Sequence, residues 1–197
     1  MRMHKGLSKG ERTKQRIIET SARLFTRMGY TSTSISRIGA NLGISKATFY
    51  SHFDSKEGLS LAVLDYAAQI FTHHYTQAIL NVSDYLEKIR VLVQAHGKVL
   101  VSDYFQNGCP LVLLATETQN ERILERTREI IAAWKGYIAG IIKEGKEKGD
   151  ISQDVDPQEI GALIVQLLMG SDVYWRQFRD ISQFDMFLPY LEKLLRP

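Results

Sequence analysis

Apolar residues recur at spacings of three and four along almost the whole chain, and the period-two alternation of a half-buried strand is absent. This periodicity predicts a series of α-helices, each with one apolar face. We therefore expect an all-α protein with about nine helices. Their expected ranges are about 8–28, 34–41, 45–52, 54–71 and beyond, 83–105, 110–118, 120–148, 157–178 and 184–195.

Two of these helices begin with recognisable capping residues. Ser8 and Glu11 have the spacing of a capping box, in which each side chain accepts a hydrogen bond from the other residue's backbone N–H. Asp54 and Glu57 repeat this spacing at the start of the fourth helix. No linker rich in Gly or Pro separates the fourth helix from the first three. We therefore expect a movement of this helix to be transmitted directly to them.

Residues 34–53 contain the parts of a helix-turn-helix motif. Two short predicted helices are joined by Leu42-Gly43-Ile44, where glycine permits a tight turn. In the second of these helices, Phe49 and Phe53 are four residues apart and are expected to face the core. The opposite face offers hydroxyls, a lysine and an imidazole, groups that suit phosphates and base edges in a major groove.

This segment resembles the N-terminal signature of the TetR family of transcriptional regulators. The resemblance runs without a gap over about fifty residues, and it rests on Gly29-Tyr30, Thr33-Ser34-Ile35, Ile38-Gly39, Leu42 to Tyr50, His52-Phe53 and Ser55 to Leu59. It implies a three-helix DNA-binding domain at residues 1–53. A helical ligand-binding and dimerisation domain would then occupy residues 54–197.

The resemblance also implies which side chains meet DNA. The residues expected to face the DNA are Ser34, Ser45, Lys46, Thr48, Tyr50 and His52, and Lys56 is expected to touch a phosphate. Structural roles remain open: Ser34 as a helix cap, Tyr50 as a half-buried ring, His52 as a packing residue, and the two lysines as solvated charges. Because one such motif reads too few base pairs to find an operator, we expect a homodimer on near-palindromic double-stranded operator DNA.

The last two predicted helices are the expected dimer surface, since they carry more apolar surface than one core can use. The resemblance implies a four-helix interface formed by these helices from both protomers. The candidate interface residues are Ile160, Leu163, Ile164, Leu167, Ser171, Phe184, Phe187, Leu188 and Leu191. For any single one of them, a place in the protomer's own core is an equal alternative.

The middle of the chain holds aromatic and polar residues in proportions that suit a small-molecule pocket. The candidate ligand-binding residues are Phe71, His74, Tyr104, Phe105, Cys109, Trp134, Tyr137 and Trp175. Aromatic residues at helical spacing are more often plain core, so the sequence indicates a sensor domain without assigning individual rings. The resemblance implies a repressor that a small-molecule effector releases from its operator. No cofactor is expected.

Cys109 supports an alternative in which the sensor is a thiol. Pro110 starts a helix directly after it, and the positive end of a helix lowers the pKa of a thiol and raises its reactivity. The segment Gly108 to Val112 also resembles the corresponding helix start in TetR-type repressors of the electrophile-responsive NemR kind. The competing and preferred interpretation is a small apolar residue that fills a gap.

Composition restricts the class of protein. Hydrophobic residues make up 44% of the chain, enough for a substantial core, and a single cysteine excludes an intramolecular disulfide. Apolar runs stop short of the roughly 18 residues that a membrane span needs, and no signal peptide is evident. We expect a cytoplasmic protein with no membrane partner.

Charge is unevenly distributed, and no catalytic motif accompanies it. Residues 1–60 carry 11 Lys and Arg against 4 Asp and Glu, whereas the remainder carries 14 against 18. A basic end is expected where one end of a protein meets a polyanion. Catalytic and metal-binding signatures such as HExxH are absent, and neighbouring His73 and His74 point about 100° apart on a helix. We expect no enzyme and no metal site; a helical interaction module with a vestigial DNA-binding head is the alternative from a different class.

Overall fold

The computed structural model describes residues 6–105 and 107–197, and every regular element in these ranges is a helix, which confirms the all-α prediction. In this part of the chain the helices are α1 (Lys9–Met28), α2 (Ile35–Leu42), α3 (Lys46–Tyr50), α4 (Lys56–Ile79), α5 (Tyr85–Val101), α6 (Pro110–Glu117), α7 (Glu121–Lys148), α8 (Pro157–Phe178), α9 (Gln183–Met186) and α10 (Leu188–Leu195).

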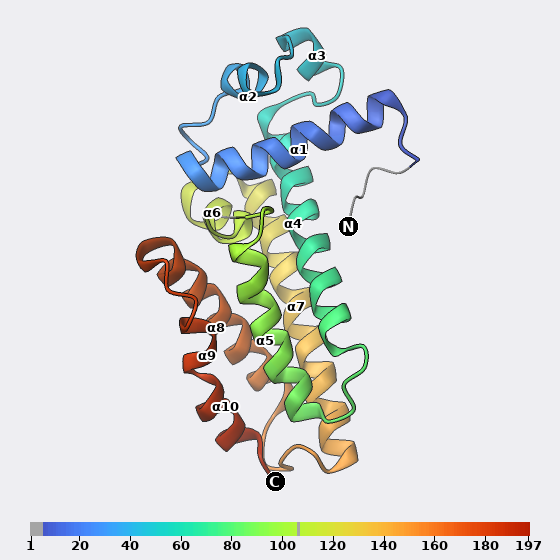
Figure 1. Ribbon diagram of the computed structural model, residues 1–197, viewed down its shortest axis with the longest axis vertical. Helices are drawn as coiled ribbons and strands as arrows, with labels where there is room; N and C mark the ends of the chain where they lie inside the picture. The colour runs from blue at the N-terminus through green and yellow to red at the C-terminus, as the bar shows by residue number, and fades with distance from the viewer. Residues whose placement is uncertain (1–5, 106) are drawn as a thin grey trace.

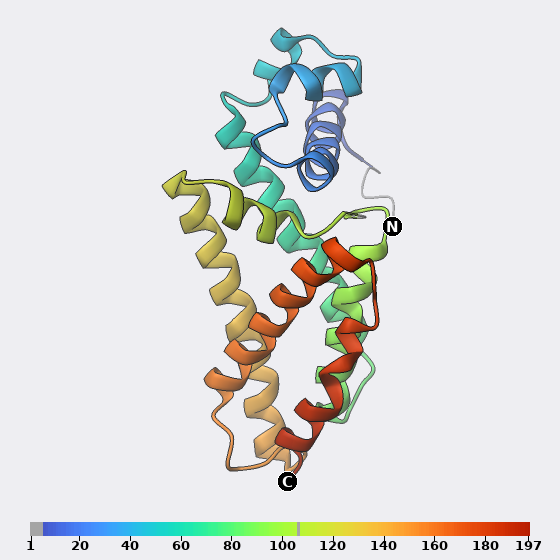
Figure 2. The ribbon, with the colours of Figure 1, turned by 90° about the vertical axis from the view of Figure 1, so that its left-hand side faces the viewer.

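The molecule is elongated, with a small head formed by α1, α2 and α3 at one end (Figure 1). The long helices α4, α5 and α7 run lengthwise below the head, and α8 packs along α7. The short helix α6 lies across the top of this bundle, directly beneath the head (Figure 2). None of the helices in the described ranges is long and apolar enough to cross a membrane.

The predicted capping box at the start of α1 is confirmed, but the predicted cap of α4 is wrong. The Ser8 N–H donates to Glu11 Oε2 over 2.8 Å, and the Glu11 N–H donates to Ser8 Oγ over 3.2 Å. At α4 the cap is Ser55, whose Oγ accepts from the Gly58 N–H at 3.0 Å. The helix begins one residue later than expected, because a hydroxyl directly before it satisfies the free N–H group.

The single helix predicted at about 184–195 is two helices. Phe187 ends α9 and also precedes α10, so this one residue separates the two helices. Pro189 stands in the first turn of α10, where its missing N–H costs no intrahelical hydrogen bond, so it favours a new helix start at this place. Ten helices therefore occur in the described ranges where about nine were expected.

Candidate DNA-binding head and sensor cavity

Two serine caps and one glycine shape the helix-turn-helix. The Arg37 N–H donates to Ser34 Oγ over 3.2 Å at the start of α2, and the Thr48 N–H donates to Ser45 Oγ over 3.1 Å at the start of α3. Gly43 ends α2 in the left-handed conformation with φ 66°, which other residues adopt at a cost. These contacts set the angle between α2 and α3.

Helix α3 has an apolar inner face and a polar outer face, as the sequence predicted. Phe49 is fully buried, Phe53 is 6% exposed, and their rings pack 5.9 Å apart. Tyr50 is 51% exposed and its ring packs edge-on against Phe49, with centroids 5.4 Å apart, so its contact with DNA and its packing role both stay predictions. The other expected DNA-facing side chains are placed as follows: Ser34, Ser45 and Lys46 are exposed, and Thr48 and His52 are half-buried. Contact of this face with DNA stays a prediction.

Lys56 is placed differently from the phosphate contact expected of it. Its Nζ donates to the Tyr30 carbonyl over 2.6 Å and lies 3.9 Å from the centre of the Tyr30 ring. Burial lowers the pKa of Lys56, and the charge of Glu117 acts in the opposite direction. In this structure the ammonium therefore links the start of α4 to the turn between α1 and α2, and a phosphate contact would require breaking that link.

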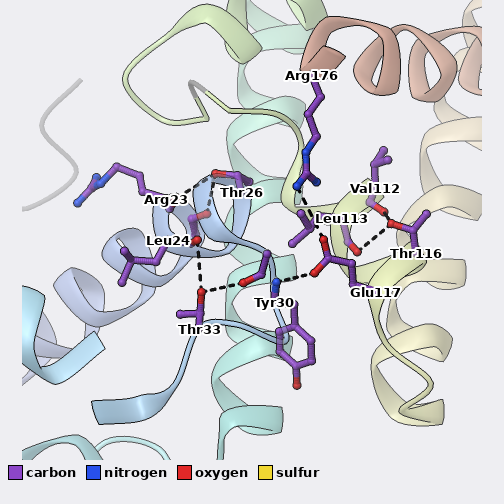
Figure 3. A network of polar contacts seen from close by, with 12 residues as sticks. Arg23, Leu24, Thr26, Tyr30, Thr33, Val112, Leu113, Thr116, Glu117 and Arg176 are labelled. Carbon is purple, nitrogen blue, oxygen red and sulfur yellow. Dashed lines mark hydrogen bonds and ion pairs between the residues drawn. The ribbon is translucent and has the colours of Figure 1, made fainter. Parts of the chain in front are cut away.

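Helix α6 is a second connection between head and bundle. Glu117, its last residue, accepts a hydrogen bond from the Tyr30 N–H at 2.7 Å through Oε2. Its Oε1 lies 3.8 Å from Arg176 Nη2 of α8 (Figure 3). Both backbone polar groups of Tyr30 are thus bonded, the N–H to Glu117 and the carbonyl to Lys56. The sequence had predicted coupling through α4 alone.

A third connection joins α4 to the start of α7. Glu57 accepts hydrogen bonds from Asn120 Nδ2 at 2.7 Å and from Arg122 Nη1 at 2.6 Å. Asn120 also caps α7 by accepting from the Ile123 N–H at 3.2 Å. The first turn of α4 therefore bonds to the Tyr30 carbonyl through Lys56 and to the start of α7 through Glu57, so a displacement of α7 would reach the head.

Three of the seven rings proposed as ligand contacts lie in the core. Phe71 is fully buried and packs on Phe105 and Trp134, with ring centroids 5.7 and 5.3 Å away. Phe105 is fully buried and Trp134 is 6% exposed. His74, Tyr104, Tyr137 and Trp175 are half-buried. For Phe71, Phe105 and Trp134 the structure favours the packing role, because each ring already has aromatic neighbours on its faces and edges.

Cys109 lines a cavity between α1, α6 and α8. The pKa of its thiol is shifted in the direction opposite to that expected at a helix start. The thiol is 3% exposed. Burial raises the pKa of Cys109 well above its ordinary value, the Asp172 carboxylate raises it further, and the N–H groups of α6 do not offset these effects. The predicted lowering was wrong because desolvation exceeds the effect of one helix terminus. A buried, protonated thiol is a poor nucleophile, which disfavours a thiol sensor.

A buried series of polar side chains runs from α4 through α5 to α8, and the sequence pattern did not predict it. Tyr75 Oη lies 2.5 Å from His96 Nδ1, and His96 Nε2 lies 2.7 Å from Asp172 Oδ1. All three side chains are at most 2% exposed. A signal for it was present, since Asp172 is the one charged residue between Ile160 and Trp175. A carboxylate in so apolar a helix needs a buried partner.

The expected dimer surface also needs correction. Seven of the nine candidates are at most 9% exposed within the protomer and so have almost no surface left to bury: Ile160, Ile164, Ser171, Phe184, Phe187, Leu188 and Leu191. Leu163 is 37% exposed and Leu167 is half-buried. The exposed apolar residues that continue this face are Tyr174, Phe178, Met186, Tyr190 and Leu194. The apolar pattern was correct, but the side chains on its inner half serve the protomer's own core.

Two family models match the chain in succession. Residues 17–63 match the model of bacterial regulatory proteins of the tetR family, and residues 86–191 match a model of the tetracyclin repressor-like C-terminal domain. The second match alone covers more than half of the chain. The first contains the helix-turn-helix, and the second runs from the start of α5 into α10.

Individual relatives agree over nearly the whole length. The HTH-type transcriptional repressor DhaR of Mycobacterium sp. (strain GP1) is 23% identical over 190 residues, which cover 93% of this chain and 92% of that protein. The crystal structure of a TetR transcriptional regulator from Chloroflexus aurantiacus superposes with a TM-score of 0.86 at 26% identity, covering 96% of this chain and 99% of that one.

The reduced form of Escherichia coli NemR has the same fold, with a TM-score of 0.80 at 18% identity over 93% of this chain and 97% of that one. At this identity the likeness extends to the fold and not to the thiol chemistry suggested by the Gly108 to Val112 segment. The helix-turn-helix, the two successive family matches and the full-length relatives lead to one conclusion. The chain belongs to the TetR family of bacterial regulatory proteins and is a DNA-binding transcriptional regulator.

Proposed function

We propose that this protein is a repressor that binds a near-palindromic operator as a homodimer and leaves it when a small molecule occupies the bundle. The observation that carries the proposal is the exposed polar face of α3, presented by a head that Glu117 and Lys56 fasten to the bundle at Tyr30. Residues 1–53 would read DNA, and residues 54–197 would sense the effector and form the dimer.

Dimerisation would occur through the exposed apolar side of α8, α9 and α10, which lie on one side of the molecule (Figures 1 and 2). The proposed contact residues are Leu163, Leu167, Tyr174, Phe178, Met186, Tyr190 and Leu194. Exposed apolar side chains that gather on one face are typical of an interface. A dimer would hold its two α3 helices about 34 Å apart, the spacing of successive major grooves.

Release would follow from a change in that spacing. An effector that shifts α6 or α7 would act on the head through Glu117 and through the contacts of Glu57, while α4 carries the movement directly. A coupling free energy of about 1 to 3 kcal/mol would weaken operator binding roughly 5- to 150-fold. This is sufficient to switch a promoter.

The test is fluorescence anisotropy of labelled duplexes at about 0.15 M salt with unlabelled non-specific DNA as competitor. The duplexes come from upstream of the protein's own gene and from genome-wide selection. We expect two protomers per duplex, and Tyr50→Ala should weaken specific binding by at least about tenfold. Lys46→Ala should weaken binding to all sequences, whereas Lys148→Ala, which removes the same charge from an exposed site on α7, should not.

The interaction-module alternative gives a different result in the same assay. It predicts that no duplex, including those from genome-wide selection, survives the competitor. Equal loss of binding in Lys46→Ala and Lys148→Ala would contradict the placement of the DNA surface on α3. Binding by one protomer per duplex would contradict the homodimer.

A further inference from the structure

A cavity of about 270 Å³ lies between α1, α6 and α8, beneath the head. Its lining includes Thr26 of α1, Cys109 and Glu117 at the two ends of α6, and Asp172 and Arg176 of α8. Drug-sized ligands occupy pockets of about 300 to 1,000 Å³, so this cavity suits a molecule smaller than those. It is distinct from the aromatic cluster around Phe71, which is filled by its own side chains.

Asp172 brings an incompletely satisfied carboxylate to this cavity. The residue is 2% exposed, and its Oδ1 lies 2.7 Å from His96 Nε2. Its Oδ2 is buried and accepts no hydrogen bond from the described residues. A buried polar atom without a partner is costly, and such atoms in a folded protein are commonly satisfied by a ligand or an ordered water.

The hydrogen-bond directions around His96 leave the charge of Asp172 without a cationic partner. We assign the tautomer in which the Tyr75 O–H donates to His96 Nδ1 and the His96 Nε2–H donates to Asp172. In this tautomer each donor among these three side chains has an acceptor. The imidazole is then neutral. Asp172 therefore carries a buried negative charge whose two side-chain neighbours, the His96 imidazole and the Cys109 thiol, are both neutral and do not balance it.

The rest of the charged lining favours a cation. Two carboxylates, Asp172 and Glu117, face the cavity together with a single cationic side chain, Arg176. Arg176 is directed toward Glu117 at a loose 3.8 Å, and its side chain is 38% exposed. The raised pKa values of Cys109 and Tyr75, to which the Asp172 charge contributes after burial, are consistent with a negative potential in this region.

We propose that this cavity binds a small protonated amine whose ammonium group donates a hydrogen bond to Asp172 Oδ2. The amine would also be the effector, because Glu117 lines the same cavity. This second step rests on the proposed function. A cation there attracts the Glu117 carboxylate away from the Tyr30 N–H, which lies 2.7 Å from it. The turn between α1 and α2 would then be released from α6 (Figure 3).

The first test compares three probes of matched size on the full-length protein without DNA: benzylamine, benzyl alcohol and benzoate. Binding is followed by ligand-observed saturation-transfer NMR and quantified by titration calorimetry. Benzylamine should bind at least about tenfold more tightly than the other two, as expected for one charge-assisted hydrogen bond. Equal binding of all three, preferred binding of benzoate, or no binding of benzylamine would overturn the proposal.

Variants then locate the site. Asp172→Asn keeps an acceptor for His96 and removes the charge, and it should weaken benzylamine binding by at least about tenfold. Asp154→Asn removes the same charge from an exposed position and should bind benzylamine like the wild type. Val112→Phe fills the cavity without touching the carboxylate and should also abolish binding. Circular dichroism checks the fold of each variant, and Val112→Phe decides the location if Asp172→Asn does not fold.

A separate measurement distinguishes a failure of the amine site from a failure of the proposed repressor function. Benzylamine is added to the operator complex in the anisotropy assay, where it should weaken binding of the wild type and not of Val112→Phe. Benzylamine binding to a protein that binds no DNA would leave the site intact and contradict the repressor. Benzylamine binding without any loss of operator affinity would overturn its role as the effector class.

Discussion

At the scale of single residues, burial decides the chemistry of this protein more than position in the sequence. Cys109 stands at a helix start, yet the surrounding side chains and Asp172 keep its thiol protonated. Lys56 matches a family position expected near phosphate, yet its ammonium is held by the Tyr30 carbonyl. In both cases the nearest neighbours are contributed by distant parts of the chain.

The raised pKa of Cys109 predicts a specific loss of stability at alkaline pH. In the unfolded chain the thiol ionises near pH 8.5, whereas in the folded protein it stays protonated. The unfolded state therefore gains a stabilising ionisation, and the free energy of unfolding falls as pH rises above about 8.5. Between pH 7.5 and 9.5 we expect it to fall by about 1.4 kcal/mol more in the wild type than in Cys109→Ala.

Urea unfolding of both proteins at the two pH values measures this difference. Tyrosine and lysine ionisations are common to both proteins and cancel in the comparison. An equal pH dependence in wild type and Cys109→Ala would mean that the thiol ionises normally in the fold, which would restore the thiol-sensor alternative.

At the scale of elements, short polar contacts at helix ends fix how the helices meet. Ser34 and Ser45 cap the two helices of the DNA-reading motif, and Gly43 closes the turn between them. Glu117 at the end of α6 and Lys56 in the first turn of α4 fasten this head to the bundle, and Glu57 joins that turn of α4 to the start of α7. The regulatory lever is therefore a set of helix ends and not α4 alone.

The left-handed conformation of Gly43 predicts that Gly43→Ala lowers the free energy of unfolding by about 1 kcal/mol, since a Cβ disfavours positive φ. Gly136 in the middle of α7 is the matched control. A Cβ there meets no atom within 4 Å, so Gly136→Ala should raise stability by about 0.5 to 1 kcal/mol. Thermal or urea unfolding measures both changes, and equal effects of the two substitutions would contradict the turn geometry.

At the scale of the whole molecule, the protomer leaves one side of α8–α10 apolar and exposed. Tyr174 and Phe178 pack on each other with ring centroids 4.3 Å apart, and Tyr190 is 76% exposed. The bundle beneath buries the opposite side of the same helices. This division of each helix into a core face and an exposed apolar face is what a four-helix dimer interface requires.

Phe178→Glu should dissociate the proposed dimer. A carboxylate buried in an apolar interface without a partner is costly, so we expect the dimer dissociation constant to rise by at least about tenfold. Leu80→Glu provides the control, because Leu80 and Phe178 are both 64% exposed but Leu80 lies at the end of α4. Sedimentation velocity over a concentration series gives the result; identical behaviour of the two variants would place the interface elsewhere.

The sequence by itself determined the helices, their approximate ends and the DNA-reading motif, because helical periodicity, capping residues and turn glycines act over a few neighbouring residues. Ser8, Gly43 and the Phe49–Phe53 pair were all placed correctly from such local signals.

Only the tertiary structure decided which half of each amphipathic helix faces the protomer's core, so that Ile160 is internal while Phe178 is exposed. It also decided that Asp172, His96 and Tyr75 meet. These outcomes depend on side chains separated by 21 to 76 residues along the chain. Burial, which sets the pKa of Cys109 and the partner of Lys56, is a property of the whole assembly of helices, and periodicity within one helix carries no information about it.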